Sequence, residues 1–388
     1  MTTTRHTILG AAITLALSTN VSAQTSLESQ IEALQAQIDA LRAQVAENSV
    51  AAETAISAVE SNMAGAGSVQ NRVSIGAYGE LHYNNLDSRE EIDFHRFVLF
   101  FSNQFTDRLR FFSELELEHS LAGEGNPGEL ELEQAYVEYD FSPRLSAKTG
   151  LFLVPVGILN ETHEPPTFLG VERNKIESEI IPSTWWEAGA AISGRNSSGI
   201  SYDLALHSGL AVPTTGPNAY RIRSGRQKVA EAQADDLAYT GRLRYTGMPG
   251  LEFAMSLQYQ ENITQSADPE ASATLVEAHL NYQNGPLNLR ALYADWSIDG
   301  AMAQALGKDS QVGFFVEPSY RINPQLQVFA RYGEYNTFDG LPGTQDIEQT
   351  DFGVNWYLHQ DVVLKADFIN ISGAADDEGF NLGMGYQF

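Results

Sequence analysis

From residue 73 to the last residue, apolar and polar side chains alternate along segments of about ten residues. The segments 73–83, 109–118, 251–259 and 362–371 are examples, with Leu, Phe, Val or Tyr on one face and polar groups on the other. A period of two is typical of a β-strand whose two faces meet different surroundings. Because about sixteen such segments follow one another, we predict an all-β fold, a transmembrane antiparallel β-barrel.

The connections between these segments alternate between short and long. Short turns are expected at 106–107, 142–143, 247–250, 284–286 and 323–324, and longer loops at 119–130, 154–184, 210–235, 262–271, 297–310, 336–347 and 372–378. This asymmetry is typical of an outer-membrane barrel, which has short turns on the periplasmic side and longer loops outside. A soluble β-sandwich is the alternative, but it would not need so many strands.

Aromatic residues on the apolar face, near strand ends, also favour a membrane barrel, because they form girdles at the two interfaces. These residues are Tyr239, Tyr245, Tyr259, Tyr282, Tyr293, Tyr320, Tyr332 and Trp356. In the final segment, apolar residues occupy every second position from Phe380 to Phe388. A strand that ends in an aromatic residue resembles the signal read by the outer-membrane assembly machinery, so we assign Phe388 that role.

The N-terminal residues have a different composition. Residues 1–23 have a basic start, an apolar stretch and small residues at 21–23, the pattern of a secretory signal peptide. Residues 24–63 contain no Pro, Gly or aromatic residue, and their apolar residues begin with a heptad-like spacing. We predict a short periplasmic α-helical coiled coil over 24–63 that serves oligomerisation, a linker over 64–72, and the barrel over 73–388. A single amphipathic helix that packs on the barrel is the alternative for 24–63.

Composition excludes several classes of protein. The mean hydropathy of -0.23 is too low for a bundle of membrane helices, and the chain contains no Cys. A net charge of -27 argues against nucleic acid as a partner, because phosphate binding requires clustered Lys and Arg. Neither G-x-S-x-G, H-E-x-x-H nor a P-loop is present. We therefore predict neither an enzyme nor a cofactor.

One region resembles a known family. Residues 150–158, 160–166 and 181–187, preceded by 135–139, are similar to the phosphate-selective porin O and P family. The resemblance implies a sixteen-stranded barrel, usually a trimer, with a loop folded into the pore, here residues 154–184. The phosphate-specific members line the pore with an arginine ladder and a lysine cluster, which have no residue-by-residue match here. The heptad spacing favours a dimer, so a dimer remains possible beside the favoured trimer.

Alternation with apolar residues outward predicts the charged side chains that line the pore. The acidic ones are Glu80, Glu114, Glu116, Glu118, Glu138 and Glu187, and the basic ones are Arg96, Arg110, Lys148, Arg242, Arg244, Arg290, Arg321, Arg331 and Lys365. Because carboxylates concentrate on early strands and basic residues on later ones, we expect an electric field across the pore. The alternative is that these residues pair across strands and stiffen the wall.

The predicted constriction loop contributes charged and titratable side chains, Glu161, His163, Glu164, Glu172, Arg173 and Lys175. Glu161, His163 and Glu164 are a weak indication of a metal site, because no second His stands at ligand spacing. We therefore predict no metal ion. His82, His95 and His119 are interpreted as pore or rim residues.

The sequence thus predicts an outer-membrane porin that allows passive diffusion of small hydrophilic or charged solutes. The alternative is a substrate-specific channel or receptor without a plug domain, for phosphate, an organic acid or a siderophore. The coiled coil would lie in the periplasm, where it could also tether the barrel. The expected partners are outer-membrane lipid, the assembly machinery, further copies of the chain and small solutes.

Overall fold

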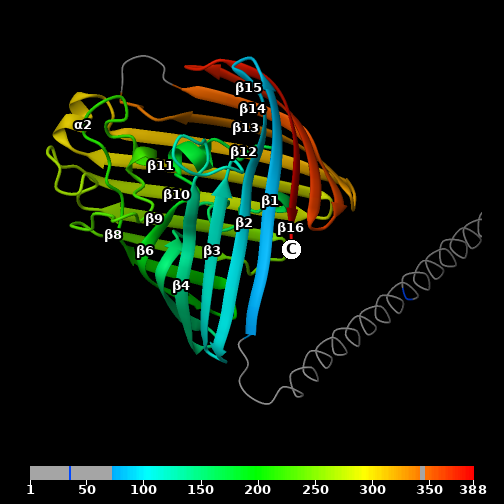
Figure 1. The fold of residues 1–388 in the computed structure, drawn as a ribbon, viewed down its shortest axis with the longest axis horizontal. Coiled ribbons are helices and arrows are strands. Elements are labelled where there is room, and N and C mark those ends of the chain that lie inside the picture. The colour runs from blue at the N-terminus through cyan, green and yellow to red at the C-terminus, as the bar shows by residue number, and fades with distance from the viewer. Residues whose placement is uncertain (1–34, 36–71, 341–345) are drawn as a thin grey trace, which may run out of the picture. The chain divides into compact units, whose positions relative to one another are not determined.

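The computed structural model describes residues 35, 72–340 and 346–388, and the described part from residue 72 onward forms one closed barrel. Its strands are β1 (Arg72–Leu86), β2 (Arg89–Thr106), β3 (Leu109–Glu118), β4 (Leu130–Ser142), β5 (Leu145–Leu153), β6 (Trp186–Arg195), β7 (Ile200–His207), β8 (Ala238–Tyr245), β9 (Leu251–Gln260), β10 (Ser272–Asn284), β11 (Leu287–Asp299), β12 (Ser310–Asn323), β13 (Leu326–Asn336), β14 (Ile347–His359), β15 (Val362–Gly373) and β16 (Asp377–Gln387). Each strand pairs antiparallel with the strands before and after it (Figure 1). The predicted sixteen-stranded antiparallel barrel is confirmed.

The barrel closes between its first and last strands, which lie side by side in Figure 1. The Ala77 N–H donates to the Phe388 carbonyl over 2.9 Å, and the Phe388 N–H donates back to Ala77 over 2.9 Å. Closure leaves no strand edge with unpaired backbone groups, which a bilayer would not tolerate. The side chain of Phe388 is 76% exposed on the outside of this seam.

Side chains alternate between the two faces of the wall as the sequence predicts. On β9, Met255 and Leu257 are 50% and 53% exposed, while their neighbour Ser256 is buried on the inner face. The eight aromatic residues predicted on the outer face all have exposed side chains there, from 37% for Tyr245 to 59% for Tyr239. This prediction is confirmed, and it defines an apolar outer band with aromatic residues toward its borders.

The two ends of the barrel differ. We call the end with the connections 107–108, 143–144, 196–199, 246–250, 285–286, 324–325 and 360–361 the turn end, and the other the loop end. The long connections 119–129, 154–185, 208–237 and 261–271 all belong to the loop end. The expected long loop at 372–378 is wrong, because β15 and β16 continue through most of it and leave only 374–376.

Among the described residues from 72 onward, helical structure occurs in short segments of the loop-end connections. These are η1 (Pro165–Thr167), η2 (Ile176–Ile180), η3 (Ile222–Gly225) and α2 (Ala301–Ala305). None of the helices in the described ranges has the length and hydropathy needed to cross a membrane. The predicted signal peptide, coiled coil and linker lie outside the described residues, apart from Gln35 and Arg72.

Candidate functional site

Residues 154–185, which we call the inner loop, fold against the inner face of the barrel. The Phe168 carbonyl accepts a hydrogen bond from Asn355 of β14 over 3.1 Å, and the Leu169 carbonyl accepts one from Arg331 of β13 over 2.6 Å. Three strands from β14 in the closed barrel, Asn84 of β1 donates a hydrogen bond to Glu172 over 3.0 Å. Arg242 of β8 also donates to Glu161, so hydrogen bonds to separated strands hold the inner loop inside the lumen.

Inward-facing glycines let the inner loop approach the wall. A Cβ placed on Gly333 of β13 would lie 2.7 Å from the Ile176 Cδ1, and one on Gly385 of β16 would lie 2.2 Å from the Pro165 Cβ. Either contact is closer than atoms tolerate, so any larger residue would displace the loop or the strand. The sequence does not reveal the role of these glycines, since a glycine in a strand does not show which residue lies against it.

The expectation that apolar side chains point outward is wrong on part of the wall. Trp296 of β11 and Phe315 of β12 point inward, are almost fully buried, and belong to one core with Ile180 and Trp185 of the inner loop. The Trp296 indole N–H also donates to the Ile180 carbonyl over 2.9 Å. Alternation assigns a side chain to the inner or outer face by its polarity. It therefore cannot identify apolar side chains that point inward and pack against loops inside the barrel.

A second connection, 208–237, also packs inside and was not predicted to do so. Arg226 donates to the Thr184 carbonyl over 2.7 Å, and Arg223 donates to the carbonyls of Ser178 and Ser183. Arg221 forms an ion pair with Glu179. Three arginines of the second connection thus bind the inner loop.

The strand register places the predicted acidic side chains on the inner face. Glu80, Glu114, Glu116 and Glu187 are 1–2% exposed, and Glu118 and Glu138 are partly exposed. Arg96 lies between the first wall strands, with its Nε 2.7 Å from Glu80 and its Nη1 3.3 Å from Glu116. The Arg96 guanidinium therefore lies between the two buried carboxylates and offsets the repulsion between their charges.

The predicted basic residues also face inward, and most have a carboxylate beside them. Arg331 contacts Glu317 at 2.7 Å and Asp351 at 2.8 Å. The other pairs are Arg110 with Glu138 and Asp140, Arg242 with Asp203 and Glu161, Arg244 with Glu252, and Arg290 with Glu317. Such pairs neutralise charge locally, so the two walls are less opposed in sign than the sequence pattern suggested, in line with the alternative of pairing across strands.

Three predicted basic residues have other surroundings. The Lys148 ammonium lies 5.2 Å from the centre of the Tyr136 ring, and the Lys365 ammonium lies 3.4 Å from the centre of the Phe168 ring. Arg321, at the turn end, donates to the Pro324 carbonyl over 3.1 Å. The first two are cation–π contacts, and that of Lys365 ties β15 to the inner loop.

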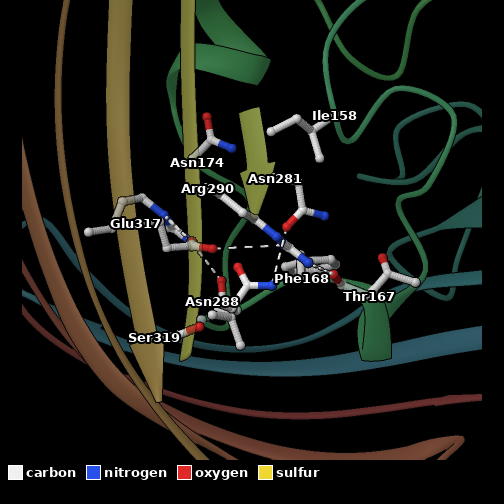
Figure 2. Close-up of polar contacts among 12 residues, drawn as sticks. Ile158, Thr167, Phe168, Asn174, Asn281, Asn288, Arg290, Glu317 and Ser319 are labelled. Atoms are coloured by element: carbon white, nitrogen blue, oxygen red, sulfur yellow. Dashed lines mark hydrogen bonds and ion pairs between the residues drawn. The ribbon is translucent and has the colours of Figure 1, made fainter. Parts of the chain in front are cut away.

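Arg290 shows how the wall and the inner loop meet. Its guanidinium reaches from β11 to the Thr167 carbonyl, 2.9 Å away, while the Glu317 carboxylate of β12 lies 3.8 Å off on its other side (Figure 2). Asn288 and Asn281 lie beside it and are joined by a hydrogen bond of 3.2 Å. Polar side chains of β10, β11 and β12 and a carbonyl of the inner loop thus surround one charged group.

The side chains predicted for the inner loop divide into three groups. Glu161 is paired with Arg242, and His163 is buried between Glu114 at 3.3 Å and Glu133 at 3.7 Å. Arg173 donates to the Thr184 hydroxyl over 3.0 Å and to the His163 carbonyl, while Lys175 lines a cavity. Glu164 is partly exposed.

Two loop carboxylates have shifted acidities. Burial alone would raise the pKa of Glu172, but hydrogen bonds from His82 and Asn84 and the charge of His82 outweigh it and hold the pKa well below its usual range. Burial raises the pKa of Glu177, against the effect of the Leu159 and Ile158 N–H groups and Asn174, which donate to its carboxylate. Glu177, which the sequence analysis did not select, organises the bend of the inner loop.

Two polar cavities lie toward opposite ends of the barrel. The one near the loop end, which we call the outer cavity, has a volume of about 270 Å³ and lies between β1, β2 and the inner loop. Five Asp or Glu and five Arg or Lys side chains line it, so its formal charge balances although the chain carries -27. The cavity near the turn end, about 280 Å³, is lined by four arginines and three carboxylates.

Comparison with known proteins decides the family. Residues 69–377 match the family described as phosphate-selective porin O and P. The chain belongs to this family. The porin is also 33% identical over 332 residues to an uncharacterised protein of Aquifex aeolicus (strain VF5). The alignment covers 78% of this chain and 76% of that protein.

Solved structures share its fold. The anion-selective porin from Comamonas acidovorans has a TM-score of 0.58 at 10% identity, over 82% of this chain and 100% of that one. The outer-membrane channel DcaP of Acinetobacter baumannii has a TM-score of 0.56 at 12% identity, over 82% of this chain and 97% of that one. Family and fold identify an outer-membrane porin and point to a channel rather than an enzyme.

Proposed function

We propose that this porin lets small hydrophilic and charged solutes diffuse passively across the outer membrane, with the inner loop as the constriction. The observation that supports this most directly is the pair of charge-lined cavities toward opposite ends of one closed barrel. A solute that passes between them meets side chains of both signs, which favours hydrated, polar molecules over apolar ones.

Single-channel conductance of the purified porin in a planar bilayer tests this proposal. We expect stable open steps whose size scales with salt concentration, and a reversal potential in a salt gradient that gives the ion preference. Absence of conductance in protein that shows the heat-modifiable mobility of a folded barrel would contradict passive diffusion.

A second candidate is a channel specific for anions such as phosphate. Arg173 and Arg223 favour it, because their guanidinium groups line the outer cavity and bind only carbonyl or hydroxyl oxygens of the described residues, not carboxylates. Two cations without a paired carboxylate could attract an anion. Phosphate added to a chloride solution should then reduce the conductance at low concentration, and R173Q should weaken this block, whereas R108Q, at an exposed turn, should not.

We also infer that the chain assembles as a trimer and that its N-terminal coiled coil lies in the periplasm. Support for the trimer comes from a structural relative of this fold, OmpT of Vibrio cholerae, described in a trimer form, with a TM-score of 0.53 at 10% identity. Cross-linking of the full chain and of a chain that lacks residues 24–63 separates the two contributions. A trimer that survives the deletion would assign oligomerisation to the barrel, and a dimer that depends on 24–63 would assign it to the coil.

A further inference from the structure

Three potential metal ligands converge in the outer cavity. Asp93 and His95 lie on β2, and His119 follows directly after β3. The Nδ1 atom of His95 lies 3.0 Å, and that of His119 2.7 Å, from the same oxygen of Asp93, Oδ2. One ligand atom from each of the three residues lies within 4.8 Å of the others.

A β-bulge builds this cluster. Glu80 pairs with Arg96 and His82 with Asp93, so two steps along β1 face three steps along β2. The extra residue of β2 allows Asp93, His95 and Arg96 all to line the cavity, which strict alternation forbids. The sequence places His95 only generally at the pore or rim, because a pattern with a period of two does not reveal the bulge.

The backbone fixes the third ligand. The His119 N–H donates to the His95 carbonyl over 3.1 Å, so His119 is held beside the residue of β2 that carries the second imidazole. His119 has a φ of +51°, a conformation uncommon outside glycine, and such conformations cluster at functional sites. The ring of His82 stacks on that of His95 at 4.7 Å and restricts its orientation.

The chemistry of the three groups suits a transition-metal ion. Imidazole and carboxylate ligands bind ions such as Zn²⁺ at about 2.0–2.2 Å, so two ligands of one ion lie roughly 3 Å apart. The distances of 2.7 and 3.0 Å to Asp93 Oδ2 are close to that value. The side chains of Asp93, His95 and His119 are 19%, 24% and 32% exposed, which leaves the cluster open to an ion from the cavity.

We propose that Asp93, His95 and His119 form a binding site for a divalent transition-metal ion at the loop end of the barrel. The remaining coordination positions would face the cavity and hold water. An ion bound there would add positive charge among Glu80, Glu91 and Glu172, which line the same cavity with Arg89, Arg96 and Arg173. The inference goes beyond the proposed diffusion of solutes and does not depend on it.

Zn²⁺ binding to the full chain, purified in detergent without a histidine tag, tests the site. Isothermal titration calorimetry should give one high-affinity Zn²⁺ per chain, and H95A and H119A should each weaken it at least tenfold. Co²⁺ should bind to the wild type with visible absorption bands, and these should be lost in both variants. Millimolar Mg²⁺ should not displace the ion, because Mg²⁺ prefers oxygen ligands.

Two matched variants control for other histidines. His359 is exposed at the end of β14, at the opposite end of the barrel, and among the described residues its ion pair is with Asp361, so H359A should bind Zn²⁺ as the wild type does. H163Q tests the buried group of His163, Glu114 and Glu133 and should also retain the high-affinity site. Unchanged affinity in H95A and H119A, or loss of the site in H163Q or H359A alone, would overturn the proposal.

Folding and function are checked separately. Every variant should show the heat-modifiable mobility of the wild-type barrel, so that loss of Zn²⁺ cannot be attributed to unfolding. Calorimetry does not require conduction. A chain that binds Zn²⁺ without conducting would contradict the diffusion proposal alone, and a chain that conducts without binding Zn²⁺ would contradict the metal site alone.

Discussion

Gly385 of β16 lies directly against Pro165 of the inner loop, and a Cβ on Gly385 would stand 2.2 Å from the Cβ of Pro165. The last strand therefore lacks a side chain at the point where the loop begins its short η1 turn. This contact links the closing seam of the barrel to the segment that crosses its lumen.

The first prediction follows from this contact. G385A should lower the free energy of unfolding by about 1–3 kcal/mol, because overpacking forces the loop or the strand to shift. Urea unfolding in lipid vesicles measures the change. G241A is the matched control, because a Cβ there would lie an ordinary 3.4 Å from Leu204, and equal losses in both variants would contradict the explanation.

Arg331 supports the second prediction. R331M removes the arginine paired with Asp351, which is 4% exposed, one of the two arginines paired with Glu317, and a hydrogen bond to the inner loop. Removing one partner of a buried pair costs about 3–5 kcal/mol, since it leaves a buried charge unpaired. The same unfolding measurement should give a much smaller loss for R321M, whose arginine has no ion pair with the described residues.

The third prediction concerns acid. The pKa of Glu172 lies below its ordinary value near 4.5 in the folded barrel, so protonation disfavours its contact with His82 and Asn84. The stabilisation is complete above pH 4.5 and is lost as the pH falls through the lower folded value. The apparent unfolding temperature, followed by heat-modifiable mobility, should therefore begin to drop as the pH falls below about 4.5 and should keep dropping at lower pH. E164Q, the control, should show the same pH dependence as the wild type.

E172Q should abolish most of this drop, because the amide does not titrate. At neutral pH this variant should already resemble the acidified wild type, with a lower unfolding temperature. A full wild-type pH response in E172Q would show that another group is responsible.

The fourth prediction tests the outer face. Met255 is 50% exposed near the middle of β9, and a basic residue there would face lipid. M255R should cost about 2–4 kcal/mol of unfolding free energy, whereas Y259R, near the end of the same face, should cost about 0–1 kcal/mol. Equal effects at the two positions would argue that this face is not in the bilayer.

The strands and the faces of most polar residues were predictable, because alternation depends on each residue and its two neighbours. That pattern alone placed Glu80, Arg242 and Arg331 on the inner face, and their exposed fractions in the barrel are 2%, 6% and 5%. The family could also be named from local motifs, chiefly those within 150–187.

The ion pairs were not predictable, because they depend on which strands adjoin and in what register. Arg331 meets Asp351, twenty residues away, and Arg242 meets Glu161, eighty-one residues away. The metal-ligand cluster depends on one bulge in β2, which shifts faces without any mark in the composition.

The sequence by itself thus determined a barrel of sixteen alternating strands, its outer aromatic residues and the family, since these are properties of short stretches of chain. Only the tertiary structure decided what fills the barrel. Trp296 and Phe315 point inward because the inner loop offers them an apolar surface, and Gly385 is small because Pro165 lies against it. In both cases the contacting residues are more than a hundred positions away in the sequence. A local pattern of apolar and polar residues carries no information about such contacts.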